Sequence, residues 1–373
     1  MSFRPNGVSG EIYIETNKTN NMKKIIISMM AVAALAACTK SEVQYEPAGE
    51  ISFAPVAKNV TKSVAGYDEY GAFDGVFPTN VNLYVFANAS NDAGTAWEDP
   101  YFANALFKHD PDKGTEGTQT HPTLGTVATT GAYAGYPTRY WPNVKTLKFA
   151  GYSDACNVST LTPTMNKEFT ALTINGYVQD NTQITEGAND LMWFPCDGQA
   201  YTKQANEIAA QMKHACSWIT INVAGDDVTA GNWTLNSLVV KTLKHSGNVV
   251  CNATTAEWTL TGVGADEEYY KPTTGTTFTE EYLKYEKNTN NFIVLPQEPT
   301  DLEVNYTYTS DATNNLTLTE TKSVSLDYDA AGTAWQPGVH YIYNVLITAS
   351  EILIDPVVVD WTNYGNEIDK TVN

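Results

Sequence analysis

The sequence predicts an all-β protein, built from two tandem β-sandwich domains with long loops. Composition supports this, because the chain has 22 tyrosines, 12 phenylalanines and 8 tryptophans besides abundant threonine, and such side chains favour strands. Hydrophobic residues recur at alternate positions in several segments, which is typical of half-buried strands. A length of 373 residues is also sufficient for two domains that each bury a core.

The charge balance limits the classes of partner. Aspartate and glutamate number 42 against 22 lysines and arginines, which gives a formal net charge of −20. Such a chain repels phosphate backbones, so we expect no nucleic-acid partner. Ordinary disorder is also excluded, because only 17% of residues are charged and 42% are hydrophobic.

Residues 22–37 are predicted to be a lipoprotein signal peptide. Lys23 and Lys24 precede an uncharged run that ends at Ala37, and this run is too short to cross a hydrocarbon core of ~30 Å. Its end, Leu-Ala-Ala-Cys, is the pattern that lipoprotein signal peptidase accepts, so we expect cleavage between Ala37 and Cys38 and palmitate on Cys38. The alternative is an ordinary signal peptide with a chance cysteine. Residues 1–21 are interpreted as a start-site artefact, and residues 38–49 as a tether to the outer membrane.

Strands are expected where apolar and polar residues alternate or where apolar runs have strand length: 81–87, 147–152, 218–223, 302–309, 316–319, 341–348 and 352–361. Pro356 predicts that the last of these is an edge strand or carries a bulge. Residues 204–212 have helix-forming composition and are left open, whereas residues 89–139 are predicted to be mostly loops. A composition shift near residues 197–206 divides the chain into an N-terminal sandwich, 50–200, and a C-terminal sandwich, 201–373.

No motif for catalysis is found, and we expect no catalytic residue, no metal and no cofactor. The chain has no nucleophile elbow, P-loop or dinucleotide fingerprint. No metal-binding motif is formed by its five histidines, which are His109, His121, His214, His245 and His340. Residues 110–116 faintly resemble a calcium loop, which a solvated loop explains as well. The tryptophans are expected mostly in the core. Four cysteines after the signal could form disulfides or remain buried thiols: Cys156, Cys196, Cys216 and Cys251.

Several segments in order resemble the fimbrillin family, FimA/Mfa-like, which builds type V pili. The first is the Leu-Ala-Ala-Cys end of the signal peptide. The others are Glu50–Phe53 with Val60–Ser63, Arg139–Pro142 leading into Leu147–Tyr152, Asp190–Trp193, Lys213–Val223, and Gly338–Asn344 with Pro356–Trp361. The resemblance implies transthyretin-like, Greek-key sandwiches and export as a cell-surface lipoprotein. It also implies that a protease cuts after a basic residue and removes an N-terminal strand, whose place a neighbouring subunit's strand then takes.

Carried onto this sequence, the resemblance assigns the displaced strand to Ile51 and Phe53, and the cut to Lys62 and Ser63, with Lys58 as a second choice. Arg139 is the only arginine after the signal, so an arginine-specific protease could not make this cut. The donor strand would contain Val357, Val359 and Trp361, or else residues 352–354.

The leading interpretation is a non-enzymatic structural subunit of cell-surface fimbriae, which polymerises or caps a fibre and supports adhesion. Its expected partners are other fimbrial subunits, the outer membrane through Cys38, and ligands on host or bacterial surfaces. The alternatives are a non-polymerising surface lipoprotein that binds glycans, an uncut pilus anchor and, least supported, an exported hydrolase. A stalk, tip or anchor role is not distinguished by the sequence.

Overall fold

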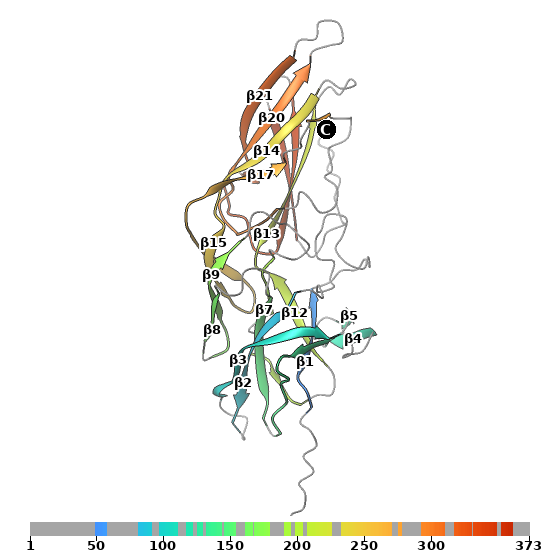
Figure 1. Cartoon of the computed structure of the whole chain (residues 1–373), viewed down its shortest axis with the longest axis vertical. Helices are drawn as coiled ribbons and strands as arrows, with labels where there is room; N and C mark the ends of the chain where they lie inside the picture. Colours follow the sequence, from blue (N-terminus) through green and yellow to red (C-terminus); the bar gives the residue numbers. More distant parts are fainter. Residues whose placement is uncertain are drawn as a thin grey trace, which may run out of the picture. The chain divides into compact units, whose positions relative to one another are not determined.

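The computed structural model describes the part of the chain that belongs to one compact unit, Gly49–Asn373. The described residues are 49–57, 81–91, 97–110, 117–121, 125–129, 132–143, 145–153, 161–166, 168–179, 190–194, 198–203, 207–225, 233–270, 275–277, 292–309, 317–329, 331–348 and 352–360. They form 23 strands and no helix, which confirms the predicted all-β fold (Figure 1). These residues accordingly contain no helix of the length and apolar character that a membrane span requires.

The largest sheet contains the first strand of the fold near its middle. Its strands, in spatial order, are β10 (Met192–Phe194), β12 (Ile208–His214), β1 (Ser52–Ala57), β6 (Ala132–Gly135), β3 (Trp97–Asp110), β2 (Leu83–Ser90), β7 (Leu147–Ser153) and β11 (Ala200–Tyr201). β10 also pairs with β7, so seven of these strands form a hydrogen-bonded ring. We call this ring, β10-β12-β1-β6-β3-β2-β7, the closed sheet. One hydrophobic core fills it.

Two further sheets pack around a second core. One contains β19 (Phe292–Val294), β13 (Ser217–Gly225), β22 (Val339–Ile347) and β23 (Ile352–Asp360); the other contains β17 (Ala265–Tyr270), β14 (Trp233–Leu243), β20 (Asp301–Thr309), β21 (Thr317–Ser325) and, beside β14, β18 (Thr276–Thr277). Alternate side chains of β13 and β22 meet those of β14 and β20 in a single cluster. This is the arrangement of a β-sandwich.

A third core joins the closed sheet to a smaller sheet. That sheet contains β16 (Ala256–Thr261), β15 (Ser246–Cys251), β9 (Leu172–Val178) and β8 (Thr162–Met165). The cluster includes Tyr152 and Trp193 of the closed sheet, Ile174 of β9 and Val249 of β15. A separate hairpin contains β4 (Gly117–His121) and β5 (Gly125–Thr129), and β5 lies beside β1.

The expected strands are all present within the described residues, with ends that differ by a few positions. The segment 204–212, left open between helix and strand, contributes β12, because alternate residues of it enter the core of the closed sheet. This packing outweighs its helix propensity. The prediction of mostly loops over 89–139 is wrong, since β3 runs for 14 residues and β4, β5 and β6 follow.

Two other expectations concern the C-terminal half. Pro356 lies in β23, which is an edge strand in continuous register with β22, as the proline predicts. The division of the chain at residues 200 and 201 stays a prediction. Strand pairing crosses that position twice, because β12 joins the closed sheet and β9 pairs with β15.

Candidate functional site: the first strand of the closed sheet

β1 is paired on both sides. It runs parallel to β12, where Phe53 to Ala57 match Ile208 to Met212, and antiparallel to β6, where Phe53 matches Tyr133. A strand inside a closed sheet leaves no unpaired edge, and its removal exposes the edges of both neighbours. For β1 these neighbours are β6 and β12.

The side chains of this segment fill the core of the closed sheet. Ile51 is 1% exposed and Phe53 is 0% exposed. The ring of Phe53 contacts three other rings, with centroid distances of 4.9 Å to Phe107, 5.2 Å to Phe149 and 5.7 Å to Phe194. The first two contacts are edge-to-face, a favourable aromatic geometry. Without β1, the core would have a vacant position walled by aromatic rings.

The residues just before β1 are held by a second segment. Ile51 N donates to Arg139 O at 2.8 Å, and Trp141 N donates to Gly49 O at 2.9 Å. Glu50 and Tyr140 are opposite each other in this short antiparallel bridge. Trp141 is buried, but Tyr140 is 46% exposed. Removal of residues 49–57 would therefore also free backbone groups next to Arg139.

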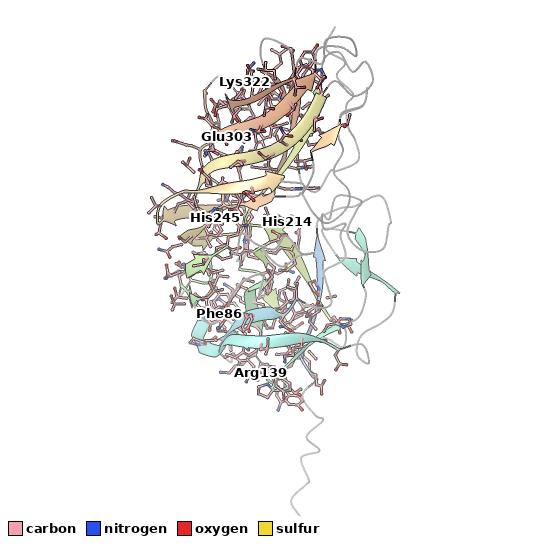
Figure 2. The ribbon with its side chains drawn as sticks, turned by 45° about the horizontal axis from the view of Figure 1, so that its top comes forward. Phe86, Arg139, His214, His245, Glu303 and Lys322 are labelled. Carbon is pink, nitrogen blue, oxygen red and sulfur yellow. The ribbon has the colours of Figure 1, made fainter. Side chains whose placement is uncertain are left out.

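The closed sheet depends on a very short strand, β10. It pairs with β12 through Met192 and His214, and with β7 through Trp193 and Tyr152. A buried polar contact supports this closure, since His214 Nδ1 lies 2.6 Å from Asp190 Oδ2, within hydrogen-bond distance. The buried His214 ring therefore has a polar partner. Arg139 and His214 lie at opposite ends of the closed sheet (Figure 2).

The predicted donor residues lie on β23, the most exposed strand of the sheet β19-β13-β22-β23. Within the described residues, β23 pairs with β22 alone, and the backbone register matches Val357 with Ile342 and Val359 with His340. Ile352 and Ile354 are partly buried against the second core, whereas Leu353 and Val358 are each 46% exposed. β23 thus has one paired edge where β1 has two.

Other predicted site residues lie outside the described part of the chain: Ala37, Cys38, Lys58, Lys62, Ser63 and Trp361. Their predicted roles in cleavage, lipidation, maturation and donation stay predictions. Cys156 and Cys196 also lie outside it, whereas Cys216 and Cys251 are buried and form no disulfide within the described residues. The stretch 111–116, which contains most of the calcium-like segment, is likewise outside.

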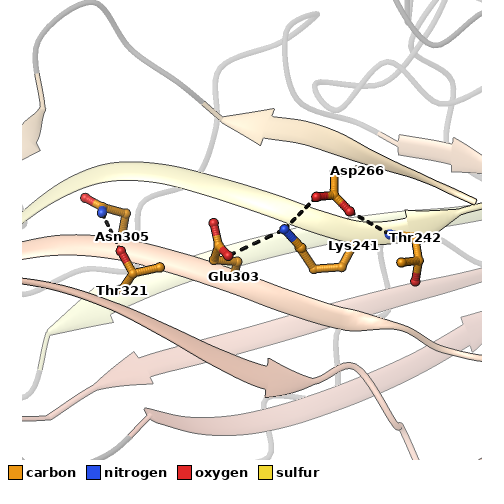
Figure 3. Close-up of polar contacts among 6 residues, drawn as sticks. All are labelled: Lys241, Thr242, Asp266, Glu303, Asn305 and Thr321. Carbon is orange, nitrogen blue, oxygen red and sulfur yellow. Dashed lines mark hydrogen bonds and ion pairs between the residues drawn. The ribbon is translucent and has the colours of Figure 1, made fainter.

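Titratable groups gather on the outer face of β14, β17 and β20. Lys241 Nζ lies 2.6 Å from Asp266 Oδ2 and 3.5 Å from Glu303 Oε2 (Figure 3). The hydrogen bond between Lys241 and Asp266 raises the pKa of the amine and lowers that of the carboxyl. Burial and the charge of Glu268 raise the pKa of Glu267 to about 7. In the described residues, no three potential metal ligands come together.

The sequence model of the fimbrillin-like family matches residues 79–361. The chain belongs to this family. The resemblance drawn from the six short segments is thereby confirmed. The match begins after β1 and covers the other strands of the closed sheet, together with β23.

Solved structures similar to this fimbrillin-like chain include proteins from Bacteroides and Parabacteroides species. A fimbrial protein from Bacteroides vulgatus has a TM-score of 0.53 at 15% identity, over 75% of this chain and 93% of that one. A fimbrial assembly protein from Parabacteroides distasonis has a TM-score of 0.40 at 12% identity, over 83% and 95%. The first of these supports the fold. No curated protein matches the chain.

Two features of the site were not found from the sequence. Parallel pairing of β1 with β12 joins residues more than 150 positions apart, and no local pattern specifies such a pair. The exposure of Tyr101 and Tyr136 was also missed, since both lie in the stretch that was predicted to be loops. The feature of the sequence that could have indicated this exposure is the Tyr136-Pro137 pair, which is close to Arg139 and Tyr140.

Proposed function

We propose that this fimbrillin-like protein is a structural subunit of cell-surface fimbriae that joins its neighbours by strand exchange. A protease cuts after Lys62 and releases the segment that contains β1. A strand from a neighbouring subunit then occupies the vacant position in the closed sheet. The subunit reaches the outer membrane as a lipoprotein with its lipid on Cys38, and the fibre supports adhesion to host or bacterial surfaces.

The position of β1 supports this proposal more than any other observation. Loss of an edge strand would cost a sheet one pairing, whereas loss of β1 opens two edges and empties the Phe53 site at once. Both the hydrogen bonds and the apolar core are restored only by another strand with alternating apolar side chains. Such a groove therefore favours association with a donor over remaining empty.

The donor is best sought in β23. A donor must leave its own sheet, and β23 gives up one ladder of hydrogen bonds when it does so. Val357, Val359 and Trp361 alternate in the sequence as the groove requires. Ile352 and Ile354 offer the same spacing on the other face of the strand, so the two registers are separate hypotheses.

Two other roles within the family differ in specific ways. An uncut subunit would keep β1 and its lipid, and would serve as an anchor. A non-polymerising lipoprotein would bind a glycan without exchanging strands. A stalk subunit needs both the groove and the donor, while a tip subunit needs only the groove.

A disulfide that locks β1 in place tests the proposal. Ser52 and Ala134 are direct partners across β1 and β6, and both are partly exposed. In the mature chain, Ser52→Cys with Ala134→Cys should form a bridge at the distance of paired strands. After limited cleavage with a lysine-specific endoproteinase, we expect the unmodified chain to begin at Ser63 and to form detergent-resistant oligomers.

The locked variant should be cut at the same bond, remain monomeric, and assemble once a reductant is added. Lys58→Ala with Lys62→Ala controls for cleavage elsewhere, and each single cysteine variant controls for the substitutions. A chain that begins at Ser63 and stays monomeric would exclude polymerisation by this route. For the donor, Val359→Asp and Ile354→Asp distinguish the registers, because only the register in use should lose assembly.

A further inference from the structure

The exposed tyrosines of the described residues gather in one place. Tyr101 is 41% exposed, Tyr136 is 69% exposed and Tyr140 is 46% exposed, and the other large apolar side chains exposed to this degree are valines and leucines. Tyr101 lies on β3, and the other two follow β6. We call these three side chains the tyrosine platform. Neighbouring exposed apolar side chains mark binding sites more often than singly scattered ones do.

The platform is held in place by its surroundings. Tyr101 Oη donates to Tyr140 O at 2.8 Å, and Tyr136 N donates to Leu106 O at 2.8 Å. The Lys108 Nζ atom lies 5.0 Å from the centre of the Tyr136 ring, within range of a cation–π contact. Rings that are fixed before binding lose little conformational entropy when a ligand stacks on them.

Two cations lie at the platform of an otherwise acidic protein. Besides Lys108, Arg139 contributes a guanidinium 5.6 Å from the centre of the Phe102 ring, and the neighbourhood of Arg139 is shown in Figure 2. The chain as a whole has a formal net charge of −20. One carboxylate also faces the platform, because Glu50 is the direct partner of Tyr140 and directly opposed residues point to the same side.

We propose that the tyrosine platform binds an acidic oligosaccharide. The rings stack against the apolar faces of the sugars, and Lys108 and Arg139 pair with the carboxylate groups of the ligand. A protein partner fits less well, since a stable protein interface needs about 800 Å² from each side and three side chains offer much less. A neutral glycan would leave the two cations without a role.

Glu50 opposes this binding, because its charge repels the carboxylates of the ligand. Loss of the Glu50 charge should therefore tighten binding. The platform is complete in the uncut mature chain, so binding can be measured there without strand exchange. Failure of assembly and failure of glycan binding are consequently separate results.

Calorimetric titration of the mature chain with galacturonic acid trimer and 3′-sialyllactose tests the proposal, with maltotriose and lactose as neutral controls. We expect an acidic sugar to bind and the neutral sugars to bind at least about tenfold more weakly. Tyr136→Ala should weaken binding by about threefold to tenfold, and Tyr136→Phe should not, because the ring remains. Lys108→Gln should lower the affinity only for the acidic sugar, and Glu50→Gln should raise it.

Val263→Ala, at a side chain that is 93% exposed on another part of the fold, is the matched surface control and should change nothing. The melting temperature of each variant verifies that folding is intact. The proposal is overturned if neither acidic sugar binds, if neutral sugars bind equally well, or if Tyr136→Ala leaves the affinity unchanged.

Discussion

The first and last strands of the described fold, β1 and β23, differ in how firmly they are held. β1 is paired on both sides and carries Phe53, whose ring is completely buried among three others. β23 is paired on one side, and Leu353 and Val358 are each 46% exposed. Strands with few buried contacts open with little free energy, and central strands open only with the whole domain.

This difference suits a subunit that must not assemble early. If β1 left spontaneously, an unfilled groove would be present before export was complete. Under the proposed strand exchange, a cut in the chain would be required to release β1, because it is held on both sides. β23 would detach more easily, since it gives up one ladder of hydrogen bonds and only the partly buried contacts of Ile352 and Ile354 with the second core. In this proposal proteolysis would control the acceptor, while the donor would be available throughout.

The largest effect should follow from Phe53→Ala, which tests β1, the more firmly held of the two strands. Removal of a fully buried phenylalanine leaves a cavity and is expected to cost about 4 kcal/mol in the free energy of unfolding. Chemical denaturation of the uncut chain measures this. Val358→Ala on β23 is the control and should cost less than about 0.5 kcal/mol. Equal costs at the two positions would remove the basis for the comparison.

A somewhat smaller loss in the free energy of unfolding is expected from Asp190→Ala, which weakens the closure of the sheet and leaves β1 itself unchanged. The substitution leaves the buried His214 ring without its carboxylate partner, and an unsatisfied buried polar group costs about 1 to 3 kcal/mol. Asp190→Asn retains a hydrogen-bonding side chain and should cost less. If Asp190→Ala were harmless, β10 would not depend on this pair for its position.

Hydrogen exchange compares the two strands directly in the unmodified chain. Amides of β23 should exchange at least about tenfold faster than those of β22, its one strand partner among the described residues, because β23 can open locally. Amides of β1 should exchange at the slow rate at which the closed sheet unfolds. Ile354→Ala, at a partly buried position, should speed the exchange of β23 and leave β1 unchanged. Comparable protection of β1 and β23 would contradict the proposed roles.

The sequence predicted much of the fold because strand alternation is local. Ile51 and Phe53 were correctly expected on the same buried face, and Pro356 correctly indicated an edge. Non-local pairing was beyond reach, since nothing in residues 52–57 specifies β12 as a parallel neighbour. Helix propensity also obscured β12 itself, where packing in the closed sheet decides the structure.

The smallest expected effect is a pH-dependent change in stability. It should appear in the sandwich that contains Glu267 and not in the closed sheet that contains β1. Burial and Glu268 raise the pKa of Glu267 in the folded sandwich to about 7 from 4.5, so the folded state holds this proton more tightly than the unfolded one. Its contribution to stability is therefore present below pH 4.5 and is lost as the pH rises towards 7. Glu267→Gln should melt like the unmodified chain at pH 4 and about 1 to 2 °C higher at pH 8, a modest shift because the group is partly solvated. The difference should be confined to melting of the sandwich, while the protection of β1 amides in Glu267→Gln should match that of the unmodified chain at each pH. A shift of β1 protection in this variant would show that the two regions unfold as one unit, and that β23 cannot detach independently of the groove it is proposed to fill.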